Sequence, residues 1–462
     1  MESLAPGVQN AGQPSDPQKG QIVRPFEITL RMVAALAVPM TLAYMTTPLL
    51  GVVDTAVVGR LGDPALIGGL AVGAVLVDLL FTTFNFQRSG TTGLTAQAVG
   101  AHDEKETQAI LMRALLLAAV AGVAMIVLSW PILKIGLWFM APGAGVAEAT
   151  ADYFQIRMLS APFALANYAI LGWLIGLGRT GLGLAIQTLL NGTNILLSIL
   201  LGLWLGYGIA GVAWATVIAE ALATVVGLVL CRALMDPQTR PSRARIVERA
   251  AWKRLVNLNG DIMVRSFTLL FAFAFFTAQG ARFGEITLAA NAILMHFFIV
   301  GGYFLDGMAT AAEQIVGRAL GAHYRAAFLR GLKLTLVISV ALAVMLTAFY
   351  FVFGNALIAL LTTVESVRAE AALYLVFAAL TPLTGVLAFQ MDGVYIGATW
   401  SREMSLMMLV SAAAYLASWW LMAEPLANTG LWLALHVFLL TRGITLSAML
   451  APKLRSAFPQ VR

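Results

Sequence analysis

The chain carries very little charge. Only 11% of its 462 residues are Asp, Glu, Lys or Arg, against about 25% in typical soluble domains. Hydrophobic residues make up 60%, and the mean hydropathy is +0.84. So few charged side chains cannot cover a surface exposed to water, which excludes a soluble enzyme. The apolar runs reach about 20 residues or more, the length of a helix that crosses a ~30 Å hydrocarbon layer, so we predict an all-α polytopic membrane protein.

Catalytic and metal-binding patterns are also missing. The sequence has no GxxxxGK[ST] motif for a nucleotide-driven pump and no clustered acids of the DDxxD type for a magnesium-dependent transferase. His296 and His436 lie in apolar runs without a second ligand at metal spacing. We therefore expect a protein that is not an enzyme, has no cofactor or bound metal, and has no nucleic-acid partner.

The sequence also lacks the features of a disulfide-bonded or secreted protein. Cys231 is the only cysteine, so no disulfide can form within the chain. Residues 1–25 contain no apolar segment before a small-residue cleavage site, which argues against a removable secretory signal. We expect a disordered cytoplasmic tail there.

Twelve apolar spans, bounded by Gly, Pro or clusters of charge, organise the remaining sequence. They cover residues 31–58, 66–87, 109–134, 148–176, 181–205, 208–234, 254–280, 286–312, 326–350, 366–397, 403–423 and 429–450. An even number of spans places both termini on the same side of the membrane.

A basic linker separates the sixth span from the seventh. The linker and the residues that flank it contain seven basic side chains: Arg232, Arg240, Arg243, Arg245, Arg249, Lys253 and Arg254. Only Asp236 and Glu248 oppose them, so the positive-inside rule makes this linker and both termini cytoplasmic. The predicted parts are the tail 1–25, an N-terminal six-helix lobe 26–234, the linker 235–253, a C-terminal six-helix lobe 254–451 and a cytoplasmic tail 452–462.

The two lobes repeat each other at a constant offset of 221 residues. The matched pairs include Gly100 and Gly321, His102 and His323, Tyr153 and Tyr374, Gly172 and Gly393, and Gly176 and Gly397. Because each lobe has an even number of spans, the pseudo-two-fold axis runs along the membrane normal. We predict two six-helix bundles around a central cavity, which is transporter architecture.

Acidic residues at membrane depth are the candidate functional groups. An ionised carboxylate there costs about 2.5–3.5 kcal/mol even on the lenient insertion scale, so each acid needs a cavity, a partner or a proton. Asp54 lies in the outer half of the first span among small and polar residues, and we interpret it as a site that binds and releases a proton. The alternative is a cavity-facing acid with a structural hydrogen bond.

The other acids favour structural interpretations. Asp306 and Glu313 share one helix face, and Asp392 lies beside Gly393. We expect interior arginines or backbone amides as their partners, with a gating role as the alternative. Asp78 and Glu220 are further candidates, for which a structural role is again favoured.

Three segments resemble a known family. Residues 85–101 (NFQRSGTTGLTAQAVGA), 306–322 (DGMATAAEQIVGRALGA) and 391–399 (MDGVYIGAT) are similar to the multidrug and toxic compound extrusion (MATE) family, in its DNA-damage-inducible F branch. The resemblance implies two six-helix bundles in a V around a central cavity. It also implies cation-driven antiport that removes organic solutes, including drugs and toxic compounds, from the cytoplasm.

The resemblance also implies a coupling site. It places Asp54 at the family's ion-binding acid in the first helix, with Tyr153, Asn194 and Thr216 in the polar network around it. The family commonly has Asn-x-x-x-Asp in the fifth helix, whereas this chain has Ser198 at the second position, and we include Ser198 in the polar network as a neutral member. A proton needs only one carboxylate, so we predict proton coupling through Asp54, with sodium as the alternative.

Other functions remain as alternatives. A flippase for a lipid-linked precursor would need basic residues such as Arg157 and Arg265 to hold a diphosphate, and a receptor would need larger termini. The abundance of Arg over Lys and of Ala suggests a GC-rich bacterial genome. We expect a monomer in the bacterial inner membrane whose partners are small organic substrates and the lipid bilayer.

Overall fold

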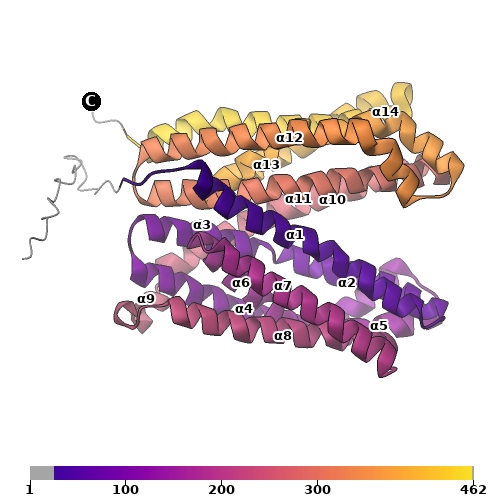
Figure 1. Cartoon of the computed structure of the whole chain (residues 1–462), viewed down its shortest axis with the longest axis horizontal. Coiled ribbons are helices and arrows are strands. Elements are labelled where there is room, and N and C mark those ends of the chain that lie inside the picture. The colour runs from indigo at the N-terminus through magenta and orange to yellow at the C-terminus, as the bar shows by residue number, and fades with distance from the viewer. Residues whose placement is uncertain (1–24, 460–462) are drawn as a thin grey trace, which may run out of the picture.

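The computed structural model describes residues 25–459, and within that range the regular structure is entirely helical (Figure 1). The N-terminal half contains α1 (Leu30–Gly59), α2 (Pro64–Thr83), α3 (Phe86–Gly100), α4 (Glu104–Met140), α5 (Ala144–Met158), α6 (Ala161–Gly176), α7 (Thr180–Leu197), the π-helix η1 (Ser198–Trp204) and α8 (Gly208–Leu234). The connecting segment contains the 3₁₀ turn η2 (Pro237–Thr239) and α9 (Arg243–Ile246). The C-terminal half contains α10 (Arg249–Gly280), the 3₁₀ turn η3 (Ala281–Phe283), α11 (Glu285–Gly321), α12 (Arg325–Leu361), α13 (Glu365–Gly397) and α14 (Ser401–Ala457).

The predicted tail 1–25 lies outside the described residues, apart from Pro25. The predicted tail 452–462 is described as far as residue 459, and most of it extends the last helix, because α14 continues through Pro452 to Ala457.

The described chain has the twelve predicted membrane crossings. Ten helices are long and apolar enough to span a bilayer, and the pair α5 and α6, bent by 51°, supplies another crossing. The 57 residues of α14 would measure about 86 Å as one straight helix, far beyond a bilayer core. Ala427 has a non-helical backbone (φ 46°, ψ −127°) and divides α14 into two crossings. The prediction of an all-α, twelve-span membrane protein is confirmed.

Paired close contacts confirm the internal repeat. Gly172 of α6 lies against the backbone carbonyl of Arg88 in α3, where a Cβ atom would collide with the carbonyl oxygen. Gly393 of α13 lies in the same way against the carbonyl of Ala309 in α11, and both members of this second pair are 221 residues further along the chain. One turn later the contact recurs, with Gly176 over Thr92 and Gly397 over Glu313. The repeat therefore consists of two equivalent helix crossings that only glycine permits.

The two halves are joined at one end of the molecule. One hydrophobic cluster contains side chains of both halves, among them Leu36, Leu94, Leu258 and Ile315. It lies toward the end that carries α9 and both ends of the described chain, which we call the linker end (Figure 1). Elsewhere each half has its own large cluster, drawn only from residues 57–213 in one half and 272–439 in the other. The halves therefore share a hydrophobic core at the linker end and have separate cores toward the opposite, far end.

Helix α1 contacts both the N-terminal and the C-terminal half. In Figure 1 it runs obliquely from the linker end beside the C-terminal half to the far end beside the N-terminal half. Near its middle, the hydroxyls of Tyr44 and Thr310 of α11 lie 3.0 Å apart. Three turns later Asp54 accepts a hydrogen bond from Ser198, within the N-terminal half. One helix thus contacts both halves and carries the candidate coupling acid.

Candidate functional site

Asp54 is held by a neutral hydroxyl. Oγ of Ser198 donates a 2.8 Å hydrogen bond to Oδ1 of Asp54. Asp54 is half-buried, Ser198 is fully buried, and within residues 25–459 no basic side chain forms an ion pair with Asp54. Arg157 acts on Asp54 from a distance but does not pair with it, and an unpaired acid at membrane depth is the arrangement expected of a group that exchanges a proton.

The π-helix η1 positions Ser198. The helix widens at Ser198 directly after α7, and such widened turns often occur at functional sites. Two glycines allow η1 to approach its neighbours. A Cβ atom at Gly202 would lie 2.7 Å from Cγ1 of Val57 in α1, and one at Gly211 of α8 would lie 2.7 Å from the backbone of Leu201. The hydroxyl of Ser198 is thereby fixed beside α1.

A second hydrogen-bonded pair lies one turn earlier in α7. Nδ2 of Asn194 donates a 2.7 Å hydrogen bond to Oγ1 of Thr216 in α8. Both side chains are buried, and Oδ1 of Asn194 has no hydrogen-bond donor among the described residues. Four of the five predicted site residues therefore form two pairs, and the free amide oxygen of Asn194 is an acceptor for an ion, a water molecule or a proton donor.

Tyr153 packs on a neighbouring helix of the N-terminal half. Its ring is buried in α5 against Gly73 of α2, where a Cβ atom would lie 2.6 Å from Cδ1. No hydrogen bond between its hydroxyl and Asp54, Asn194, Ser198 or Thr216 occurs in the described structure. Its observed contact is therefore the packing of α5 on α2.

The three acids of the C-terminal half separate into two kinds. Asp392 forms ion pairs with Arg265 of α10 and Arg442 of α14, and Arg442 is only 2% exposed. Asp306 and Glu313 form no ion pair in the described chain, where we expected interior arginines or backbone amides as partners, although Arg88 and Arg265 lie near both acids. Asp306 is exposed in the middle of α11, whereas Glu313 is buried with Oε1 lacking a donor. Asp392 therefore ties three helices together, and Asp306 is an accessible acid.

One neutral side chain contacts the carboxylate of Glu220, which the sequence left as a minor candidate. Nδ2 of Asn167 in α6 donates to Oε2 of Glu220 at 2.5 Å, and Thr224 donates to Oδ1 of Asn167 at 3.1 Å. The contacts of Arg157 could not be predicted from the sequence either. Arg157, a residue that a flippase could use to hold a diphosphate, donates a 2.6 Å hydrogen bond to Ser160 and lies 5.3 Å from the centre of the Phe81 ring.

A polar bridge closes the linker end. Nε2 of Gln97 in α3 donates to the carbonyl oxygen of Gly397 in α13 at 2.9 Å, and Nη2 of Arg254 in α10 donates to Oε1 of Gln97 at 2.7 Å. We call Gln97, Arg254, Gly397 and the adjacent Thr399 the linker-end bridge. It joins the two halves where they also share their hydrophobic core.

No metal site is apparent in the described part of the chain. Among residues 25–459, no group of three His, Cys, Asp or Glu side chains could hold a metal ion.

The chain matches a family model and known relatives over most of its length. The model described as MatE matches residues 39–200 and 262–421. DNA damage-inducible protein F of Escherichia coli is 38% identical over 416 residues, which are 90% of each chain. The protein of Caulobacter vibrioides named "Probable multidrug resistance protein NorM" is 27% identical over 443 residues, 92% of this chain and 89% of the relative.

Solved structures show the same fold. A crystal structure of MATE in the straight conformation superposes with a TM-score of 0.85 at 16% identity, covering 93% of this chain and 97% of that one. The outward-facing conformation of a multidrug resistance MATE family transporter superposes with a TM-score of 0.81 at 17% identity, covering 93% and 96%.

Proposed function

Because the chain belongs to the MatE family of multidrug and toxic compound efflux transporters, we propose that it is a proton-coupled antiporter that exports organic cations from the bacterial cytoplasm. The family is one of transporters rather than enzymes, and the multi-pass helical fold agrees with it. The observation that carries the proposal is Asp54, an acid in a membrane span whose hydrogen-bond partner in the described chain is the neutral Ser198.

The surroundings of Asp54 favour a proton over sodium. A desolvated sodium ion requires several oxygen ligands and compensating negative charge. Asp54 supplies one charge, and Asn194, Ser198 and Thr216 offer only neutral groups. A proton requires a single carboxylate and removes the need to keep a charge at membrane depth. Sodium coupling is the second candidate, and the free Oδ1 of Asn194 is the observation that favours it.

The proposed cycle is alternating access. Protonation of Asp54 from outside removes its charge, changes its hydrogen bond with Ser198 and shifts α1 relative to α7 and α8. Because α1 also contacts α11 through Tyr44 and Thr310, this shift reaches the C-terminal half. Substrate leaves, and the linker-end bridge opens so that substrate can enter from the cytoplasm. In this cycle the basic linker and both termini are cytoplasmic, as the positive-inside rule indicates.

The accessible side chain of Asp306 supports the proposal that the substrates are cations. Its side chain is exposed and has no ion pair in the described chain, and α11 contacts α1 at Gly307, directly beside it. Arg265, Arg88 and Arg442 lie close enough to act on it electrostatically, and we propose that within this charged group the carboxylate of Asp306 is the part that contacts an organic cation. The protein acts as a monomer in this proposal, since each chain contains both halves.

The test is ethidium transport in reconstituted vesicles. Efflux is measured for the wild type under an imposed pH gradient and, separately, under a sodium gradient. Asp54→Asn and the control Asp152→Asn, which changes an exposed acid without a hydrogen-bond partner in the described chain, are measured beside it. We expect pH-driven efflux in the wild type and the control, and none in Asp54→Asn.

Three results would contradict the proposal. Efflux that follows only the sodium gradient would replace the proton with sodium, and normal efflux by Asp54→Asn would remove Asp54 from the mechanism. Absence of efflux under either gradient would favour a lipid-precursor flippase. That function has weaker support, because Arg265 is already paired with Asp392 and Arg157 is bonded to Ser160.

A further inference from the structure

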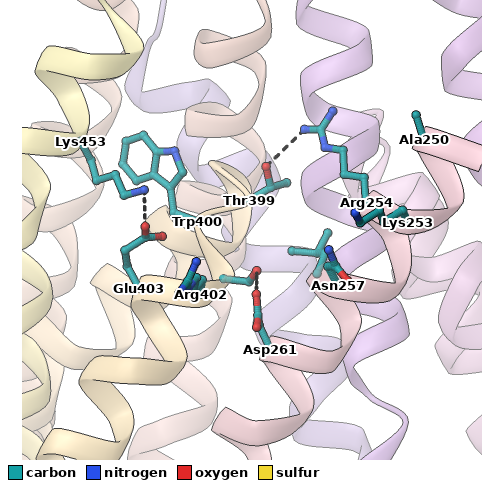
Figure 2. A pocket seen from close by; sticks show the side chains of 12 residues that line it. Ala250, Lys253, Arg254, Asn257, Asp261, Thr399, Trp400, Arg402, Glu403 and Lys453 are labelled. Carbon is teal, nitrogen blue, oxygen red and sulfur yellow. Dashed lines mark hydrogen bonds and ion pairs between the residues drawn. The ribbon is translucent and has the colours of Figure 1, made fainter.

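A basic pocket lies at the linker end, apart from the site around Asp54. Figure 2 shows this pocket, which has a volume of about 490 Å³. Its walls come from the start of α10, the turn between α13 and α14, and the end of α14. The lining side chains include four basic residues, Lys253, Arg254, Arg402 and Lys453, and two acids, Asp261 and Glu403.

Both acids of the pocket are already bound. Glu403 forms an ion pair with Lys453, and Oγ of Ser401 donates a 2.7 Å hydrogen bond to Oδ2 of Asp261 (Figure 2). The pocket therefore keeps an excess of two positive charges, and its acids do not neutralise the remaining cations directly.

Two of the cations are free to bind an anion. The side chains of Lys253 and Arg402 are exposed, and neither makes a hydrogen bond or ion pair within residues 25–459. Both lie on the wall of the pocket, one from α10 and one from α14 (Figure 2). An ammonium and a guanidinium that line one pocket from two different helices suit a phosphate group, which can accept hydrogen bonds from both.

We propose that this pocket binds the phosphate headgroup of an anionic phospholipid. The pocket lies at the ends of membrane-spanning helices, the level at which a bilayer presents its phosphates, and basic pockets between such helices are known to hold anionic headgroups. Trp400 lines it half-buried, and Trp is typical of the interface between headgroups and acyl chains. A volume near 490 Å³ holds more than an isolated phosphate ion.

The bound headgroup would also lie next to the linker-end bridge. Arg254 lines the pocket and donates to Gln97 of the other half, and Thr399 lines it beside Gly397. A phosphate that attracts the guanidinium of Arg254 competes with Gln97 for its donors. Anionic lipid in this pocket therefore acts on the contact that joins the two halves.

Lipid binding to the purified full-length protein tests the proposal. Dioleoyl phosphatidylglycerol, dioleoyl phosphatidylcholine and inorganic phosphate are titrated separately, and binding is followed by native mass spectrometry and by the shift in melting temperature. The pocket variant is Lys253→Gln/Arg402→Gln. The matched control is Lys333→Gln/Arg330→Gln, which removes one Lys and one Arg that are exposed on α12 outside the pocket.

We expect the wild type and the control to bind phosphatidylglycerol more tightly than phosphatidylcholine. The pocket variant should lose about tenfold or more in affinity for phosphatidylglycerol, since each basic residue near an anionic surface contributes roughly a factor of five. If the double variant does not fold, Arg402→Gln alone is compared with Arg330→Gln.

Three outcomes would overturn the proposal. Equal binding of the two lipids would show that the pocket does not select an anionic headgroup. Inorganic phosphate that displaces phosphatidylglycerol at millimolar concentration would identify a site for free phosphate. Equal losses in the pocket variant and the control would show that general surface charge, rather than this pocket, attracts the lipid.

Discussion

Ser198 donates a 2.8 Å hydrogen bond to the carboxylate of Asp54, although 144 positions separate the two residues in the sequence. Ser198 also occupies the position at which the family resemblance leads us to expect a second acid. One hydroxyl in place of a carboxylate leaves Asp54 as the single negative charge of this site. The identity of residue 198 therefore has a direct consequence for the choice of coupling ion.

Ser198→Asp should introduce sodium dependence. A carboxylate beside Asp54, with Oδ1 of Asn194 nearby in α7, gives the charge and the oxygen ligands that a sodium ion needs. We expect ethidium efflux that responds to a sodium gradient in reconstituted vesicles. Ser198→Ala is the control, because it removes a hydrogen bond to the Asp54 carboxylate, worth about 1.5–3 kcal/mol, without adding a charge, and should therefore not introduce sodium dependence. A Ser198→Asp variant that ignores sodium would contradict this account of the site.

Alanine at the repeat glycines should destabilise the protein. Gly172→Ala and Gly393→Ala each place a methyl group on a backbone carbonyl of the neighbouring helix, and such overpacking costs about 1–3 kcal/mol. We expect both variants to melt at lower temperature in a detergent-based unfolding assay. Gly192→Ala is the matched control, since a Cβ atom there has nothing within 4 Å. Equal melting of all three variants would argue against the close helix crossings.

Asp392→Asn should strongly destabilise the C-terminal half. It would leave Arg442 buried without its counter-charge, and breaking a buried pair in this way costs about 3–5 kcal/mol. Asp392→Asn/Arg442→Gln should recover part of the loss because it also removes the buried cation. Thermal unfolding followed by size-exclusion chromatography measures both. Wild-type melting by the single variant would show that the pair is unimportant for stability.

In Gln97→Ala the two halves should separate more often at the linker end. The change removes hydrogen bonds to Gly397 and Arg254, each worth about 1 kcal/mol, while leaving the shared hydrophobic core in place. Leu94→Cys, introduced in a Cys231→Ser background, reports exposure of that core through its reaction with a water-soluble maleimide.

We expect Gln97→Ala to raise the labelling rate several-fold. Gln238→Ala, at an exposed position of the connecting segment, should leave the rate unchanged. An identical rate in both variants would mean that the bridge does not limit opening.

Sequence analysis reached far into the fold because membrane spans are determined locally. A run of about 20 apolar residues has to form a helix in lipid, where unpaired backbone groups are costly, whichever helices surround it. The number of spans followed from this, including the separate spans 403–423 and 429–450 on either side of Ala427, whereas the repeat followed from the constant 221-residue offset between matched residues. The π-helix at Ser198 could not be predicted from the sequence, because it depends on close contacts with α1 and α8.

The sequence by itself determined the membrane-spanning class, the two-fold repeat and the acids that deserve attention, since composition, length and spacing govern these. Only the tertiary structure decided what each acid does. It gave Asp392 two arginines, Asp54 a single hydroxyl and Asp306 an open side chain, and it placed Tyr153 in packing contact with Gly73. The physical reason is that these partners lie on other helices, and the charge state of a carboxylate in a membrane depends on the groups that neighbouring helices bring within a few ångströms.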